Sequence, residues 1–230
     1  MPIDPALLQK IALLRDFPAA ELAELAAAAM ERKMARREVL LQKGEQPQFL
    51  PILLDGRLQG IDFTLDGREV GLYFVGVGEF CGELSLIDRL PMAETVIALA
   101  PSRLLLLPRE QARAMMFSAP GAAEKLALRL AGRLRAVASQ RLLLALSNPM
   151  QRLCAQLLQM ARETESRIES SVLVIPSAPT HQEIAIMINM SRETVTRAFQ
   201  QLQNQEVLRR DGSQLLILNV RQLELMASGE

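Results

Sequence analysis

The sequence predicts an α+β fold with four parts: short N-terminal helices, an antiparallel β-sandwich or roll, a long helix, and a helix-turn-helix with a β-hairpin. Three observations predict it: helical apolar spacing near the N-terminus, short apolar runs separated by glycine turns over residues 38–107, and helical spacing again after Pro108. With 230 residues, 50% of them hydrophobic, the chain is long enough for one large domain or two ordinary ones.

The first elements follow from apolar spacing and turn residues. Residues 5–35 are rich in Ala and Leu at helical spacing, and Pro18 divides them into two predicted short helices, with Met30 in the helical pattern. From Glu38 to about Leu107, glycine corners such as Asp55-Gly56 separate short apolar runs at roughly 8 to 12-residue intervals. This spacing is typical of short antiparallel strands.

A long helix is predicted over residues 120–147, because no proline occurs between Pro120 and Pro149. A stripe that is apolar except for Arg141 advances by threes and fours through Leu126, Leu130, Leu134, Val137, Arg141 and Leu144. Such a stripe exceeds what one small domain usually covers, so we expect a second copy of the helix to pack on it and form a dimer. Residues 119–147 also carry five basic residues and one acidic residue, which suits either a solvated face or the wall of a pocket for an anionic effector.

A helix-turn-helix is predicted over residues 180–202. Thr180 with Glu183 forms a capping-box pattern that opens one helix, Asn189 tolerates the left-handed conformation of a sharp turn, and Ser191 can cap a second helix. The second helix has an apolar face of Val195, Ala198, Phe199 and Leu202. Apolar runs on both sides of Asp211-Gly212 then predict a hairpin, so the motif is a winged helix-turn-helix.

The exposed face of the second helix carries groups that read DNA bases. Arginine can donate two hydrogen bonds to guanine and glutamate can accept one from cytosine, while hydroxyl and amide groups can hold phosphates. The predicted DNA-binding residues are Arg192, Glu193, Arg197, Thr196, Ser191, Thr194, Gln182, Thr180 and His181. For His181, a phosphate contact and simple solvation both remain open, and both are favoured over metal binding.

These motifs resemble the Crp/Fnr family, which includes the cyclic AMP receptor protein. The resemblance rests on Ser191-Arg-Glu-Thr-Val-Thr-Arg197, on the glycine corners of residues 41–84 and on the long helix, and it covers nearly the whole chain. It implies a cyclic-nucleotide-binding-type β-roll with N-terminal helices over 1–118, a dimerisation helix over 119–147 and a winged helix-turn-helix DNA-binding domain over 148–230. It also implies that Arg192, Glu193 and Arg197 read TGTGA-like half-sites arranged as an inverted repeat.

The predicted effector pocket departs from the family pattern. Cyclic AMP binders hold the phosphate with an adjacent Arg-Ser pair, and this chain has Ala93-Glu94 there, although Gly82 and Glu83 persist. The adenine-contacting Thr-Ser pair aligns with Val137-Ala138. The resemblance therefore implies a regulator without simple cyclic AMP control.

The residues present also bear on other effectors. The cysteine cluster through which FNR proteins hold an iron–sulfur cluster is missing, since the chain has only Cys81 and Cys154. Cys81 lies where carbon-monoxide-sensing relatives keep a haem thiolate, but haem is disfavoured because Glu83 replaces the nearby histidine of those relatives. Cyclic di-GMP remains a candidate, because its phosphates and guanines suit arginine. Another small anionic effector, and action without any effector, stay open as alternatives. The predicted effector-binding residues are Gly82, Glu83, Glu94, Arg133 and Arg135, with Arg141 a further candidate on the basic helix.

Composition limits the function classes. The chain has 26 basic and 26 acidic residues, one histidine, no secretory-signal pattern and no apolar run of roughly 18 residues, so we expect a cytoplasmic protein that does not enter membranes. No nucleophile–base pair, metal-ligand spacing or phosphate-cradling loop indicates an enzyme. The prediction is a homodimeric DNA-binding regulator with RNA polymerase as a candidate partner. The alternative is a nucleotide-binding regulatory subunit that controls another protein.

Overall fold

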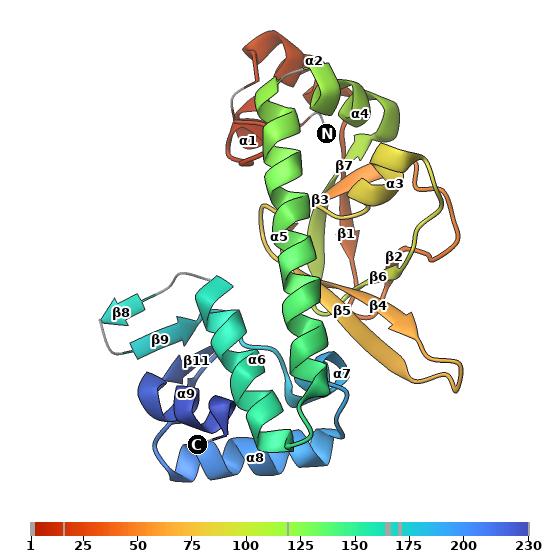
Figure 1. Cartoon of the computed structure of the whole chain (residues 1–230). Coiled ribbons are helices and arrows are strands. Elements are labelled where there is room, and N and C mark those ends of the chain that lie inside the picture. Colours follow the sequence, from red (N-terminus) through yellow and green to blue (C-terminus); the bar gives the residue numbers. More distant parts are fainter. Residues whose placement is uncertain (1–2, 16, 119, 164–166, 170–171, 230) are drawn as a thin grey trace. The chain divides into compact units, whose positions relative to one another are not determined.

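The computed structural model describes residues 3–15, 17–118, 120–163, 167–169 and 172–229 (Figure 1). The chain forms two compact units, residues 1–134 and 135–230, so the boundary falls inside the long helix. Helices and strands occur in both units, and the predicted α+β class is confirmed.

The first unit is built around an antiparallel β-roll. Its strands are β1 (Met30–Met34), β2 (Val39–Leu41), β3 (Phe49–Asp55), β4 (Leu58–Phe63), β5 (Glu69–Val75), β6 (Thr95–Ala98) and β7 (Ser102–Pro108). They form two sheets, in the orders β1-β7-β3 and β2-β6-β4-β5. Buried residues of both sheets, among them Leu53, Leu58, Val96 and Leu104, share one core. The β3–β4 turn requires glycine, because Gly56 has φ +94° and a Cβ there would lie 2.7 Å from the Pro101 carbonyl oxygen.

Helices cover one end of this roll. They are α1 (Pro5–Gln9), α2 (Ala19–Ala28), α3 (Glu83–Asp88), α4 (Arg109–Ser118) and the first part of α5 (Pro120–Ala145). Their apolar faces form a second core with the roll through Leu22, Ile52, Leu107, Met116 and Leu126. The predicted long helix is thereby confirmed as a helix.

Two predictions about local structure are wrong. Met30 starts strand β1 instead of continuing the preceding helix, because residues 30–34 pair with residues 102–106 of β7. This pairing overrides the helical preference of the Ala-rich segment. The segment after Gly82, expected to continue the run of strands and turns, forms the short helix α3, which starts at a left-handed Gly82 with φ +80°.

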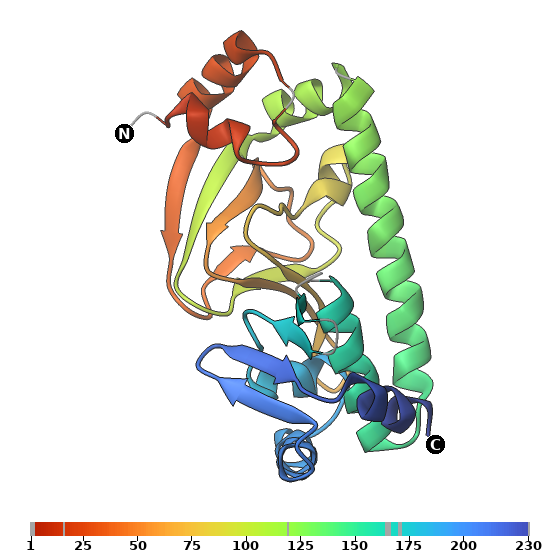
Figure 2. The same ribbon diagram turned by 90° about the vertical axis from the view of Figure 1, so that its left-hand side faces the viewer.

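The second unit is a winged helix-turn-helix. After the end of α5 it comprises α6 (Pro149–Glu163), β8 (Arg167–Glu169), β9 (Val172–Ile175), α7 (His181–Met187), α8 (Arg192–Asn204), β10 (Leu208–Asp211), β11 (Gln214–Ile217) and α9 (Val220–Ser228). The sheet order is β10-β11-β9-β8, and α6 packs on α9. In Figure 2, α8 is seen nearly end-on and the β10–β11 hairpin extends from the same unit. The helix α9 was not predicted.

Candidate nucleic-acid interface and effector site

The turn between α7 and α8 is built from local hydrogen bonds. The Thr180 hydroxyl accepts from the Glu183 amide at 3.3 Å, and the Glu183 carboxylate accepts from the Thr180 amide at 2.9 Å. Asn189 has φ +52°, and the Ser191 hydroxyl caps α8 by accepting from the Thr194 amide at 3.1 Å. The predicted capping box, turn residue and second cap are all confirmed.

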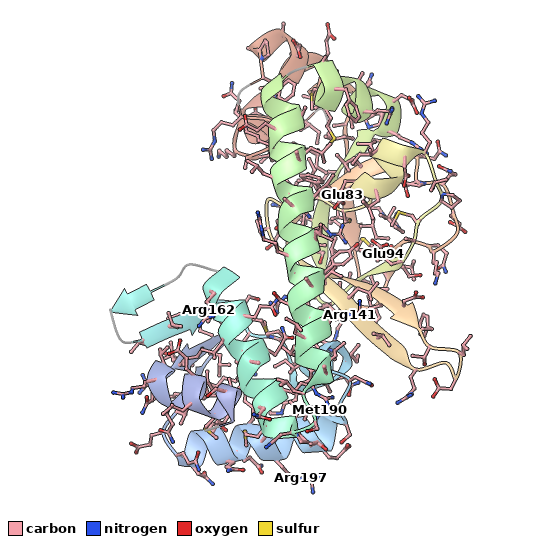
Figure 3. All side chains as sticks on the ribbon, viewed as in Figure 1. Glu83, Glu94, Arg141, Arg162, Met190 and Arg197 are labelled. Carbon is pink, nitrogen blue, oxygen red and sulfur yellow. The ribbon has the colours of Figure 1, made fainter. Side chains whose placement is uncertain are left out.

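The helix α8 has one buried and one exposed face. Its buried side chains are those predicted, Val195, Ala198, Phe199 and Leu202. Arg192, Glu193 and Arg197 are exposed, and Figure 3 shows Arg197 projecting away from α8. No residue in the described part of the chain forms an ion pair with Arg192 or Arg197, so both guanidinium groups are free to donate.

The Glu193 carboxylate is held in its charged form. A hydrogen bond from its own backbone amide, another from the Ser191 hydroxyl, and the charges of Arg192 and Arg197 keep the pKa of Glu193 below its ordinary value. An ionised carboxylate can only accept hydrogen bonds, which is what a cytosine amino group requires. The exposed face of α8 therefore presents two donor forks and one acceptor.

The polar residues beside this face have partners within the protein. The His181 ring is partly buried and stacks on Phe199, with ring centroids 4.5 Å apart, and its Nδ1 lies 3.0 Å from the Thr196 hydroxyl oxygen. The Ser191 and Thr194 hydroxyls lie 3.0 Å apart and share a hydrogen bond, and Gln182 is exposed. The DNA-binding roles of these residues remain predictions.

Two further basic residues lie on the wing. Arg209 and Arg210 are exposed on β10, and the charge of Arg210 acts on His181. The sequence pattern predicted only a strand here. The signal for a further role was the position of two adjacent arginines beside a glycine turn, since wing residues of such motifs can reach the DNA backbone.

Arg152 ties the turn between α7 and α8 to the neighbouring helices of the same unit. Its guanidinium donates to the Leu146 carbonyl at 2.6 Å and to the Ile188 carbonyl at 3.0 Å, while Gln140 donates to the Met187 carbonyl at 2.6 Å. The end of α5 and the start of α6 thus hold the backbone just before α8. No sequence pattern indicated this role, because it depends on contacts over 36 and 47 residues.

The first unit contains a cluster of two carboxylates and two guanidiniums, with Glu83 on α3 and both arginines on α5. Glu83 is fully buried and pairs with Arg133, and its carboxylate also lies 3.7 Å from Arg129. Glu94, whose side chain is 8% exposed, accepts from the Tyr73 hydroxyl at 2.5 Å and lies 3.8 Å from Arg133. Figure 3 shows the Glu83 and Glu94 positions beside α5. The cluster neutralises its own charge.

The groups around this cluster titrate far from neutral pH. Burial and the neighbouring Glu94 raise the pKa of Tyr73. The carboxylate of Glu83 and the Tyr73 hydroxyl raise the pKa of Arg133 despite the opposing effect of burial. Burial, with the charge of Glu83, also raises the pKa of Cys81, which is buried as predicted and stays a thiol.

The predicted effector residues are only partly brought together. Gly82, Glu83, Glu94 and Arg133 belong to the cluster or adjoin it, whereas Arg135 is exposed, because residues two apart on a helix face different directions. Tyr73 and Arg129 were missed. Arg129 precedes Arg133 by one helical turn, and that spacing was a signal in the sequence.

The described residues contain no group of three or more His, Cys, Asp or Glu side chains that could hold a metal ion. None of the helices in the described ranges is long and apolar enough to cross a membrane.

Comparisons with known proteins cover both units. A family profile for a cyclic nucleotide-binding domain matches residues 31–119, and one for a Crp-like helix-turn-helix domain matches residues 151–226. The chain belongs to the Crp/Fnr family. As a Crp/Fnr protein it is a DNA-binding transcription regulator.

Individual relatives agree with this assignment. The chain is 28% identical to the cyclic AMP receptor protein of Thermus thermophilus, over 92% of this chain and 94% of that one. Its fold matches FixK2 from Bradyrhizobium japonicum with a TM-score of 0.73 at 23% identity, covering 86% of this Crp/Fnr chain and 96% of that chain. It also matches the c-di-GMP responsive regulator CLP of Xanthomonas campestris with a TM-score of 0.65 at 21% identity, covering 88% and 100%.

Proposed function

We propose that this Crp/Fnr protein is a homodimeric regulator that binds an inverted repeat of TGTGA-like half-sites. The observation that carries the proposal is the exposed face of α8, where Arg192 and Arg197 have free guanidinium groups and Glu193 is ionised. The capped start of α8 suits entry of its first turn into a major groove. Such a regulator acts on the chromosome, which agrees with the predicted cytoplasmic location. Contact with RNA polymerase stays a prediction.

A mobility-shift assay tests this function. The purified protein is titrated against a palindromic TGTGA duplex and against the same duplex with both half-sites scrambled, at one fixed salt concentration because salt sets the nonspecific affinity. We expect at least about 10³-fold tighter binding to the palindrome. Equal affinity for the two duplexes would refute sequence-specific reading.

The homodimer is supported by apolar side chains exposed on α5. Leu134, Val137 and Leu144 are 72%, 63% and 38% exposed and follow helical spacing, so they form one stripe. A second copy of α5 packing on this stripe would remove it from water. The N-terminal part of the predicted stripe, including Leu126, is instead buried in the first unit.

We therefore expect Leu134→Lys to weaken the dimer, because two lysines would be brought together across a two-fold axis. Leu134 makes little contact within its own chain, so the fold of the monomer should persist. Analytical ultracentrifugation measures the dimer dissociation constant of both proteins, and Leu128→Lys, on the same helix but off this stripe, is the comparison. An undiminished dimer in the Leu134→Lys protein would remove the interface from this stripe.

We also propose that cyclic AMP does not control this regulator. Glu94 stands where cyclic AMP binders hold the phosphate, and its carboxylate already bonds Tyr73 and lies near Arg133. A cyclic phosphate would meet a like charge in a site that water scarcely reaches, and Arg133 would have to leave Glu83 to compensate. The Glu94 carboxylate already supplies the negative charge that a bound phosphate would bring to this site.

Cyclic AMP in large excess is accordingly expected to leave the melting temperature unchanged, whereas a ligand at about 1,000 times its Kd would stabilise by roughly 4 kcal/mol. The double variant Ala93→Arg with Glu94→Ser restores the Arg-Ser pair and is expected to gain stabilisation by cyclic AMP. A clear rise in the melting temperature of the unmodified protein would contradict this account of Glu94.

Cyclic di-GMP is the second candidate effector, favoured by the likeness to CLP. Arg129 and Arg133 both face carboxylates in the cluster, so its phosphates would have to displace Glu83 or Glu94. The same melting assay tests it. Stabilisation by cyclic di-GMP but not by cyclic AMP would identify the dinucleotide, and the absence of both effects favours action without a nucleotide effector.

A further inference from the structure

We propose that His181 binds a DNA backbone phosphate only in its protonated form, so that each protomer takes up one proton when the DNA complex forms. This inference rests on the proposed DNA-binding function and adds that DNA binding is coupled to the protonation of His181. It concerns a side chain for which the sequence left a phosphate contact and simple solvation open.

The hydrogen bonds around His181 determine which ring nitrogen carries the proton. The Thr196 hydroxyl donates its only hydrogen to the Arg192 carbonyl oxygen at 2.9 Å. Toward His181 Nδ1, 3.0 Å away, the same hydroxyl oxygen can only accept. Nδ1 therefore carries the hydrogen, and in the neutral ring Nε2 holds a lone pair.

Nε2 is the nitrogen left for a ligand. No backbone or side-chain group in the described part of the chain bonds it, and the ring is partly exposed. Stacking on Phe199 at 4.5 Å fixes the plane of the ring. Protonation at Nε2 leaves the bond to Thr196 intact, so the ring can become a donor without moving.

The charges around the ring favour its neutral form in the free protein. Burial, Arg210 of β10 and Arg192 of α8 lower the pKa of His181 below its ordinary value. The nearest acidic group on α7 itself, Glu183, is turned to the Thr180 amide in the capping box. At neutral pH the free protein thus presents a lone pair at Nε2.

DNA reverses this balance. A phosphate beside Nε2 would be repelled by the lone pair and attracted by an N–H donor on a cation, so the complex raises the pKa of His181. Between the free and the bound pKa, binding takes up a proton, and affinity falls as the pH rises through this interval. Outside the interval the ring has the same charge in both states, and its contribution to the pH dependence vanishes.

The pH dependence of affinity for the palindromic duplex is the first test. Over the pH interval between the pKa of His181 in the free protein and its pKa in the complex, we expect the logarithm of the affinity to fall as the pH rises, with a slope approaching about −2 for the dimer. His181→Arg, a permanent cation, should bind with little pH dependence, and His181→Gln should bind weakly with equally little pH dependence. An unchanged slope in His181→Gln would overturn the proposal.

The unmodified protein offers a test that needs no variant. His181 is the only histidine in the chain, so the imidazole signals of untagged protein report on it alone. NMR titration with and without the palindrome should show a higher pKa in the complex, and calorimetry in buffers of different ionisation enthalpy should show proton uptake. Tight palindrome binding without a pKa change or proton uptake would overturn the inference alone. Failure to distinguish palindromic from scrambled DNA at any pH would overturn the proposed function.

Discussion

Arg192→Ala is expected to weaken binding to a TGTGA palindrome by roughly 1 to 3 kcal/mol for each half-site and to relax the preference for guanine at the contacted position. The exposed Arg192 guanidinium has no partner in the described part of the chain, so its removal leaves the fold unchanged. The loss is therefore one of contacts with DNA and not of folding. Fluorescence anisotropy with a labelled duplex measures it at fixed salt concentration.

Arg162→Ala is the matched control for this prediction. Arg162 belongs to the same unit and is paired with Glu224 at 3.0 Å on the surface between α6 and α9. Its substitution by alanine removes the same charge as Arg192→Ala. Figure 3 shows it at the opposite side of this unit from Arg197. A loss with Arg192→Ala that is equal on palindromic and scrambled DNA would reduce its role to a phosphate contact.

Arg133→Ala is expected to destabilise the first unit by about 3 to 5 kcal/mol, because it leaves the fully buried Glu83 and the nearly buried Glu94 without their shared cation. Tyr73 is the only tyrosine, and the chain has no tryptophan. Urea unfolding followed by tyrosine fluorescence therefore reports on this site directly.

A double-mutant cycle and a neighbouring arginine sharpen this experiment. Glu83→Gln removes the buried charge, so in that background Arg133→Ala should cost much less. Arg135→Ala, two residues along the same helix and exposed, should change the free energy of unfolding by no more than about 0.5 kcal/mol. Equal losses for Arg133→Ala and Arg135→Ala would mean that the cluster does not stabilise the roll.

The DNA-facing part of the fold was predictable because its determinants are local. The bonds between Thr180 and Glu183 and between Ser191 and Thr194 each span three residues. A pattern of adjacent residue types is therefore enough to identify them. Met30 shows the opposite case, because its strand depends on pairing with Leu106, far along the chain.

The effector site could be predicted only in part for the same reason. The sequence identified Glu83, Glu94 and Arg133 but placed Arg135 beside them and omitted Tyr73. Which helix face meets the roll depends on packing between segments 50 residues apart. The pairing of Glu83 and Glu94 with Arg133, on which the effector proposals depend most, follows only from that packing.

The central claim is that two copies of α8 read successive major grooves of one duplex. A series of palindromes with altered spacing tests it most directly, because two recognition helices related by a two-fold axis need half-sites about 34 Å apart. We predict that inserting about five base pairs, half a helical turn, reduces affinity to that for a single half-site, and that about ten restores part of it. Affinity that is indifferent to the spacing would contradict paired reading by α8.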